Sequence, residues 1–132
     1  MEMVIDFPSE AKVDAHFGPY TIPTDQPPPS GEASAPTPFE IFLASLGTCA
    51  GIYVLGFCRK RGISTEGMRI IQRIHSNPTT GMADKIDLEI QVPSSFPKEY
   101  YNALIHSAEL CKVKKTIEQP PQFEIVTKEI QA

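Results

Sequence analysis

The segment from Pro36 to Ile52 reads PTPFEIFLASLGTCAGI, and the interpretation of the whole chain starts from it. Thr37 can cap the amides that follow, Pro38 suits the first turn of a helix, and Glu40 lies near the positive end of the helix dipole. The segment therefore predicts the first half of a long helix that carries one cysteine, Cys49, among small residues.

The predicted helix runs from residue 37 to about residue 61, where basic residues precede Gly62, a residue suited to a left-handed C-terminal cap. Between Ile41 and Cys58 there is no charged residue, so we expect this helix to be central and buried on most of its faces. Gly47 and Gly51 are one turn apart, which indicates that another element packs closely against the helix beside the cysteine.

Length and composition limit the classes of protein to consider. The chain has 132 residues, which predicts a single domain over residues 1–132. Its 12 basic and 16 acidic residues give a net charge of −4, which does not favour a nucleic-acid partner. No run approaches the roughly 20 apolar residues of a membrane span, and the first residues do not resemble a signal peptide. We therefore expect no membrane partner and a cytoplasmic location.

Before the helix, alternating apolar and polar residues predict paired strands at residues 3–7 and 12–17 and a third extended piece at residues 20–22. Seven prolines between Pro19 and Pro38 then predict a long, exposed loop. Loops of this length are either linkers or parts of functional sites, and the composition leaves both open.

After the helix, residues 67–75 and 85–92 alternate as two strands of an antiparallel hairpin, one face of which is expected to cover the helix. Residues 97–110 have helical spacing, and residues 111–118 continue or restart that helix. Residues 123–130 alternate as a last strand. The predicted fold class is therefore α+β, with antiparallel sheets around a long central helix.

The three cysteines, Cys49, Cys58 and Cys111, cannot all pair within one chain. An intracellular chain seldom keeps structural disulfides, so a redox role gains weight relative to a disulfide scaffold. Cys58 lies about half a turn around the helix from Cys49 and is interpreted as a buried structural thiol. The histidines have no metal-ligand spacing with the cysteines, and we expect neither a metal nor another cofactor.

Two cysteine motifs resemble those of the OsmC/Ohr family. The run from Pro38 to Cys49 is similar to the family pattern P-x-E-L-L-L-A-A-L-G-x-C, and Cys111 to Ile117 is similar to a degenerate form of C-P-V-S-x-x-L. The order of the predicted elements agrees with that family over essentially the whole chain.

The resemblance implies an intertwined homodimer that reduces an organic hydroperoxide. Cys49 would be the peroxidatic cysteine, Cys111 the resolving cysteine, and Glu40 a further catalytic candidate. A dithiol such as a lipoyl group would be the reductant. The apolar neighbours Ile52, Tyr53 and Phe42 suit an alkyl substrate.

The chain also departs from the family pattern. The peroxidases of the family hold the first cysteine as a thiolate with an arginine from the N-terminal region, yet no arginine precedes Arg59 here. Lys12, His16 or a lysine after Cys111 are the candidate substitutes, although lysine lacks the guanidinium fork. Glu40 is one residue later than the glutamate of the peroxidase branch; it is either a helix-dipole residue or a group that reaches a partner chain's cysteine.

The missing arginine keeps a second function open. In this alternative, a non-catalytic dimer of the same fold binds a small apolar or acyl ligand, or acts as a thiol redox sensor. Consumption of a hydroperoxide by the protein distinguishes the two functions.

Overall fold

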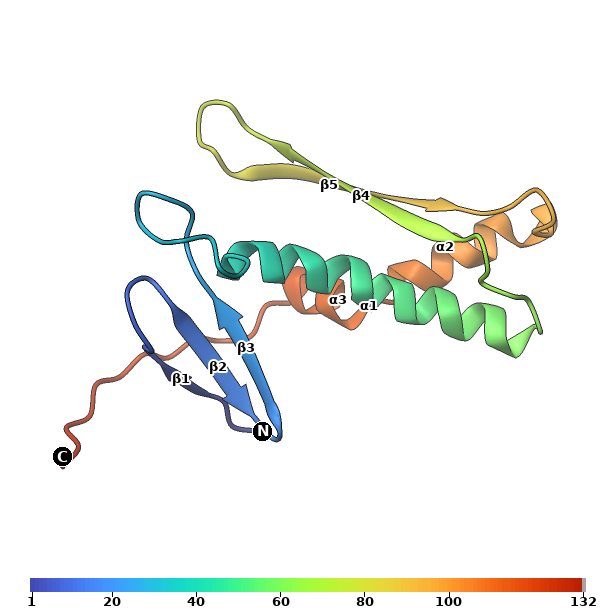
Figure 1. Cartoon of the computed structure of the whole chain (residues 1–132). Coiled ribbons are helices and arrows are strands. Elements are labelled where there is room, and N and C mark those ends of the chain that lie inside the picture. Colours follow the sequence, from blue (N-terminus) through green and yellow to red (C-terminus); the bar gives the residue numbers. More distant parts are fainter. Residues whose placement is uncertain (132) are drawn as a thin grey trace. The chain divides into compact units, whose positions relative to one another are not determined.

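The computed structural model describes residues 1–131 (Figure 1). The elements in chain order are β1 (Val4–Asp6), β2 (Val13–Phe17), β3 (Tyr20–Thr24), α1 (Pro38–Lys60), β4 (Arg69–Ser76), β5 (Ala83–Gln91), the 3-10 helix η1 (Lys98–Tyr100), α2 (Tyr101–Glu109) and α3 (Lys112–Glu118). The chain forms two compact units, Met1–Ser45 and a second from Leu46 onward, with α1 contributing to both. Antiparallel sheets and one long helix confirm the predicted α+β class.

The first unit contains a three-stranded antiparallel sheet in the order β1-β2-β3 (Figure 1). Asp6 pairs with Asp14 and Phe17 pairs with Tyr20, so consecutive strands are joined by short turns. Gly18 has a φ of +52° in the turn between β2 and β3, where an L side chain would be strained. The predicted strands are confirmed, and the third extends further than predicted, through Pro23 to Thr24.

The proline-rich stretch forms an ordered loop around the buried carboxylate of Asp25. This carboxylate accepts hydrogen bonds from the backbone amides of Gln26 (2.7 Å) and Ser34 (3.0 Å) and from the Ser34 hydroxyl. A Cβ at Gly31 would lie 2.4 Å from the Asp25 Oδ1 atom, so only glycine fits beside the carboxylate. The loop is therefore a built structure rather than a linker. Asp25 is buried, while most residues from 27 to 36 are exposed, as the sequence predicted.

Helix α1 begins with a reciprocal cap. The Thr37 hydroxyl accepts a hydrogen bond from the Glu40 amide (3.2 Å), and the Glu40 carboxylate accepts one from the Thr37 amide (2.9 Å). The helix ends at Lys60, and Gly62 follows with a φ of +65°. Both ends agree with the predicted helix within one residue.

In the second unit, β4 and β5 form an antiparallel hairpin that lies along α1 from Leu46 onward (Figure 1). A Cβ on Gly47 would lie 2.5 Å from Oε1 of Gln72, and a Cβ on Gly51 would lie 4.0 Å from Cδ1 of Ile70. The two glycines thus let β4 approach the helix, as their spacing predicted.

The C-terminal helical region is interrupted after Glu109. The backbone of Cys111 is extended (φ −48°, ψ 123°), and α3 restarts immediately after it. The buried cluster of the second unit lies between α1, α2 and the segment that follows β5; it contains Val54, Phe57, Cys58, Phe96 and Leu104. The break between the two helices places Cys111 at the start of α3.

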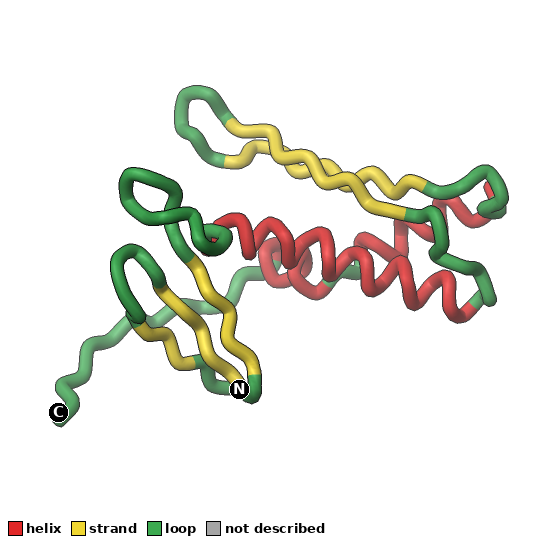
Figure 2. The backbone as a smooth tube through the Cα atoms, viewed as in Figure 1, coloured by secondary structure: helices red, strands yellow, loops and turns green. Residues whose placement is uncertain are grey.

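Two expectations about burial and pairing are wrong for the single chain. Residues 120–131 contain no strand in the described structure (Figure 2), because the alternating segment from Phe123 to Ile130 has no strand partner within the chain. The buried residues of α1, Leu46, Ala50, Val54, Phe57 and Cys58, lie on one face, while Ile52 is 59% exposed. The helix is therefore buried on one face rather than on most faces.

The expectation that no segment is long and apolar enough for a membrane span is also wrong. Helix α1 satisfies both criteria, with a mean hydropathy of 1.9 over an 18-residue window of which 28% is buried. A single such helix is weak evidence for a span, because core helices of soluble proteins pass the same test. Its contacts with β4 through Gly47 and Gly51 are those of a helix packed inside a folded unit.

Candidate functional site: a pair of cysteine thiols

Cys49 lies in the middle of α1, one residue before the buried Ala50 and two residues before Gly51. Its side chain is half-buried. Small neighbours leave the sulfur accessible to the start of α3, the helix that begins directly after Cys111.

The start of α3 supplies hydrogen-bond donors to this sulfur. The backbone amides of Val113 and Lys112 interact with the Cys49 thiolate, and the side chain of Cys111 is a third group that favours it. Amides in the first turn of a helix have no partner within the helix, so they are available to a thiolate. The structure thus brings Cys49 and Cys111 together, as the two motifs predicted.

The pKa of Cys49 is lowered from its usual value. Burial raises this pKa, but the Val113 amide, the Cys111 thiol, the Lys112 amide and the charge of Lys112 together outweigh burial. Each of these groups stabilises the thiolate more than the thiol. Cys49 is therefore the member of the pair that ionises more readily.

The pKa of Cys111 shifts in the opposite direction. Burial raises it first, since the residue is only 2% exposed, and the neighbouring Cys49 raises it further. These two effects outweigh the amides of Lys114 and Val113, which lower it. The Cys111 sulfur also lies 3.9 Å from the carbonyl oxygen of Leu46, which accepts from its S–H. Cys111 is therefore harder to ionise than Cys49.

The cation beside Cys49 is Lys112. The other two candidate substitutes for the missing arginine have partners in the first unit: Lys12 forms an ion pair with Glu32 (3.6 Å), and His16 contacts Asp6 and Thr21 (3.0 Å each). Of the three alternatives that the sequence left open, the lysine after Cys111 is the one that acts on the Cys49 thiol.

Glu40 is the third predicted site residue, and its carboxylate belongs to the cap at the start of α1. This geometry agrees with the helix-terminus interpretation. A catalytic role for Glu40 stays a prediction.

Cys58 is fully buried in the cluster of the second unit. Burial raises its pKa, and the charge of Arg61 offsets that effect only in part. It is packed as an inert structural thiol, in agreement with its predicted role.

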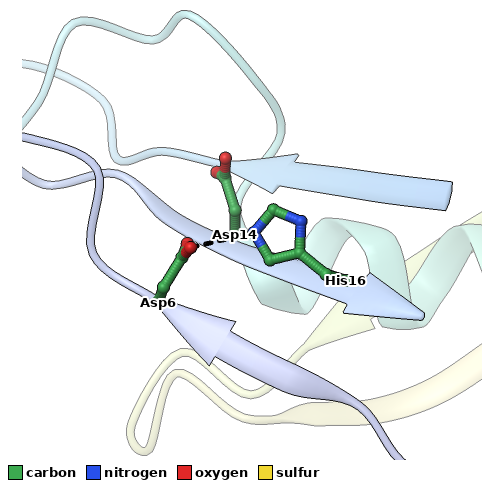
Figure 3. Close-up of side chains that lie close together, drawn as sticks. All are labelled: Asp6, Asp14 and His16. Atoms are coloured by element: carbon green, nitrogen blue, oxygen red, sulfur yellow. Dashed lines mark hydrogen bonds and ion pairs between the residues drawn. The ribbon is translucent and has the colours of Figure 1, made fainter. Parts of the chain in front are cut away.

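Asp6, Asp14 and His16 form a separate cluster on the sheet of the first unit (Figure 3). Their candidate ligand atoms lie within 4.8 Å of one another. Both ring nitrogens of His16 already have partners, Oδ2 of Asp6 and the hydroxyl of Thr21, each at 3.0 Å. Partly exposed groups that satisfy one another in this way need no metal ion, so we assign no function to the cluster.

Comparison with known families identifies the fold. Residues 31–126 match the family model described as OsmC-like protein, and this region includes both cysteine motifs. The chain belongs to the OsmC-like protein family. No curated protein has a sequence significantly similar to that of the chain.

Solved OsmC-like structures share the fold at low sequence identity. A protein from Psychrobacter arcticus, described as a putative osmotic stress induced and detoxification response protein, has a TM-score of 0.72 at 17% identity, over 86% of this chain and 85% of that one. An OsmC-like protein from Mycoplasma pneumoniae has a TM-score of 0.68 at 16% identity, over 90% and 87% of the two chains. An organic hydroperoxide resistance protein OsmC from Legionella pneumophila, also described as a predicted redox protein, has a TM-score of 0.53 at 18% identity, over 89% of each chain.

Two parts of this OsmC-like site were not predicted from the sequence. The first is the pair of backbone amides at Lys112 and Val113. The feature that could have predicted them is the interruption of the helical region at Cys111, which makes these amides the start of a new helix. The second is an aliphatic cavity beside Cys111, lined by residues of five separate elements. Neither Ile52 nor Tyr53, the expected substrate neighbours, lines this cavity.

Proposed function

We propose that this OsmC-like protein is a thiol-dependent peroxidase that reduces organic hydroperoxides, with Cys49 as the peroxidatic and Cys111 as the resolving cysteine. The observation that carries the proposal is the position of Cys111, directly before α3, beside Cys49 of α1. The directions of the two pKa shifts, lowered at Cys49 and raised at Cys111, support the division of roles. A peroxidatic cysteine must attack as a thiolate, whereas a resolving cysteine can stay protonated until the sulfenic acid has formed.

The reaction consumes one hydroperoxide and one dithiol. The Cys49 thiolate attacks the terminal oxygen of the hydroperoxide and breaks the O–O bond, and the departing alkoxide takes up a proton to become the alcohol. Cys49 is then a sulfenic acid, which condenses with the Cys111 thiol to give a disulfide and water. An external dithiol reduces the disulfide by thiol–disulfide exchange and leaves as its own disulfide.

Family membership supports a redox function of this kind. The Legionella pneumophila relative is described as an organic hydroperoxide resistance protein and a predicted redox protein. The present chain has both motif cysteines in the matched region, and two thiols are what a cysteine-based redox reaction requires.

The proposal includes a homodimer. Large apolar side chains are exposed on the single chain, and surfaces of this kind favour association with another copy; among them are Ile52 and, in the C-terminal segment, Phe123, Ile125, Val126 and Ile130. In a dimer, Glu40 of one chain is the candidate to act on the cysteine of its partner. A cytoplasmic location belongs to the same proposal, because reducing conditions return the thiols to their active state.

The test is the consumption of cumene hydroperoxide by the purified protein in the presence of dihydrolipoamide. The Cys49→Ser variant is expected to lose turnover entirely. The Cys111→Ser variant is expected to form the sulfenic acid once, detectable by dimedone labelling and mass spectrometry, without forming the intramolecular disulfide. Cys58→Ala serves as the matched control and is expected to keep the wild-type rate, because this thiol lies in the core.

Equal, slow rates for the wild type and Cys49→Ser would remove the peroxidase function. The non-catalytic alternative, a dimer that binds a small apolar or acyl ligand or senses redox state, would then be favoured.

A further inference from the structure

The junction between α2 and α3 lies against α1 (Figure 1), and two side-chain hydrogen bonds attach it there. The Ser107 hydroxyl donates to the backbone carbonyl of Tyr53 at 3.0 Å. Four residues further along the chain, the Cys111 thiol donates to the carbonyl of Leu46 at 3.9 Å. These bonds join segments that are 54 and 65 residues apart in the sequence, so they fix how the junction lies on the central helix.

The two attachment points lie on either side of Cys49 along α1. Leu46 is three residues before this cysteine and Tyr53 is four residues after it, and residues at these spacings lie on the same side of a helix. The partners run in opposite directions, since Ser107 meets Tyr53 while Cys111 meets Leu46. The junction therefore passes antiparallel to α1, alongside the turn that carries Cys49.

Backbone hydrogen bonds connect the position of Ser107 to that of Cys111. The Leu110 amide donates to the Ser107 carbonyl (3.1 Å), and the Cys111 amide donates to the Ala108 carbonyl (3.3 Å). The Lys115 amide then donates to the Cys111 carbonyl (3.0 Å) within α3. The backbone of Cys111 is thus held on both sides, and the Ser107 hydroxyl attaches that backbone to α1.

The two attachments respond differently to disulfide formation, the step of the proposed function in which the Cys49 sulfenic acid condenses with the Cys111 thiol. This step forms the S–S bond and releases water. Cys111 loses its proton, so its hydrogen bond to Leu46 is lost. The bond from Ser107 to Tyr53 involves neither sulfur and can persist while the two sulfur atoms approach to roughly 2.0 Å.

We infer that Ser107 is a positioning residue for the resolving step: its hydroxyl, bound to the Tyr53 carbonyl, holds the backbone of Cys111 beside Cys49 while the disulfide forms. Two groups that are held in place react faster, because less freedom of movement is lost on the way to the transition state. The inference rests on the proposed function. The first step, attack of the Cys49 thiolate on the hydroperoxide, does not need the Cys111 sulfur at bonding distance and depends less on this attachment.

Three variants separate the Ser107 hydroxyl from other effects. Ser107→Ala removes it, and no loss of helix is expected because alanine favours helix more than serine does. Ser107→Thr keeps the hydroxyl, and its added methyl group has space because Ser107 lines a cavity between α1, α2 and α3. Thr116→Val is the matched control, since it removes a hydroxyl that bonds only within α3, to the Lys112 carbonyl at 2.8 Å.

The first readout is single-turnover oxidation by cumene hydroperoxide, with quenching and peptide mass spectrometry. Ser107→Ala is expected to form the Cys49 sulfenic acid within about twofold of the wild-type rate. Its disulfide is expected to form about threefold to tenfold more slowly, the range for one hydrogen bond. With excess hydroperoxide, the longer-lived sulfenic acid is expected to raise the yield of Cys49 sulfinic acid by a similar factor. Ser107→Thr and Thr116→Val are expected to match the wild type.

The second readout uses diamide, a thiol oxidant that contains no peroxide. Diamide adds to one thiolate, and the second thiol then displaces the adduct, so that two thiols become a disulfide and diamide becomes the hydrazine. Ser107→Ala is expected to slow the displacement by the same factor as it slows condensation. A role in stability alone would lower the free energy of unfolding in urea and leave the ratio of the two steps unchanged.

Three results would overturn the inference: an unchanged ratio of the two rates in Ser107→Ala, an equal effect of Ser107→Ala and Ser107→Thr, or an equal effect of Ser107→Ala and Thr116→Val. Failure of diamide to link Cys49 and Cys111 in the wild type would overturn it as well. Absence of hydroperoxide turnover, together with the expected diamide results, would instead reject the proposed function and leave the positioning role of Ser107 intact.

Discussion

The side chains of Cys49 and Cys111 interact directly, and the pKa values of the two groups move apart. Two neighbouring thiols do not ionise independently, because the first negative charge opposes the second. At Cys49 the amides of Val113 and Lys112, the Cys111 side chain and the charge of Lys112 together outweigh burial. At Cys111 burial and the neighbouring Cys49 outweigh the amides of Lys114 and Val113. The asymmetry of the site therefore comes from the balance between burial and the start of α3 at each sulfur.

This asymmetry predicts an order of reactivity among the three thiols. As pH rises from about 5 to 9, iodoacetamide is expected to modify Cys49 first and Cys111 at higher pH, because only thiolates react rapidly. Cys58 is expected to react only on unfolding, because it is fully buried inside the apolar cluster of the second unit, whereas the buried Cys111 lies beside the half-buried Cys49. Peptide mass spectrometry of the alkylated protein measures all three sites together. Modification of Cys111 before Cys49 would contradict the assignment.

Replacing Lys112 tests the contribution of its charge. The Lys112→Gln variant keeps the backbone amides of α3 but removes the cation, so the pKa of Cys49 is expected to rise toward its usual value. The rate of Cys49 alkylation at pH 7 is expected to fall about twofold to fivefold, the range typical of an exposed charge. Lys115→Gln removes an equal charge from the same helix and is the control. If both variants behave alike, net charge rather than Lys112 is responsible.

The sequence predicted those parts of the fold that depend on local chemistry. The cap by Thr37, the close approach of β4 at Gly47 and the alternation of β5 all follow from residue type and spacing. The reciprocal bond to the Glu40 carboxylate was not predicted, because Glu40 was interpreted through the helix dipole. The pairing of the two cysteines followed from a family resemblance rather than from spacing.

The parts that were not predicted depend on contacts between distant segments. The amides of Lys112 and Val113 carry no side-chain signature, and the aliphatic cavity combines residues from five elements. The segment from Phe123 to Ile130 has the alternation of a strand, yet alternation cannot supply the partner edge that a strand requires.

The loop around Asp25 predicts a dependence of stability on pH. Hydrogen bonds from the Ser34 hydroxyl and from the Gln26 and Ser34 amides lower the pKa of Asp25 from 3.8 to about 2. A carboxyl whose pKa is lowered on folding stabilises the protein above its unfolded pKa. This stabilisation is expected to disappear as pH falls from about 4 to 2.

The Asp25→Asn variant is therefore expected to be less stable than the wild type at pH 7 and to lose less stability on acidification. Urea unfolding at a series of pH values measures the difference. Asp84→Asn, on the exposed part of β5, is the control and is expected to retain the wild-type profile. If the free energy of unfolding of Asp25→Asn falls with pH as steeply as that of the wild type, other groups control acid unfolding.

Two glycines of α1 are expected to respond differently to alanine. A Cβ at Gly56 would meet no atom within 4 Å, so Gly56→Ala is expected to raise the free energy of unfolding by about 0.5–1 kcal/mol through helix propensity. A Cβ at Gly47 would lie 2.5 Å from the Gln72 side chain, which must then move. Gly47→Ala is therefore expected to raise the free energy of unfolding by less than Gly56→Ala does, or to lower it. If urea unfolding gives the two variants the same increase in the free energy of unfolding, β4 does not approach Gly47 closely.

The exposed C-terminal segment predicts how the chain associates. Ile125 is 95% exposed, and its neighbours alternate as in a strand, so we expect this segment to be buried against a second copy. Burying one isoleucine contributes about 1.5–3 kcal/mol, so Ile125→Glu is expected to weaken dimer formation by at least about tenfold. Sedimentation velocity at several concentrations measures the dissociation constant.

The control is Gln122→Glu, which adds the same charge just before the alternating segment without removing an apolar side chain. It is expected to leave the dimer intact, because charge alone at an exposed position contributes little. A monomeric wild type, or equal weakening by Ile125→Glu and Gln122→Glu, would contradict association through this segment. Hydrogen exchange provides a second measurement: the amides from Phe123 to Ile130 are expected to be protected in the dimer, since a paired strand shields its amides, and to lose that protection in Ile125→Glu.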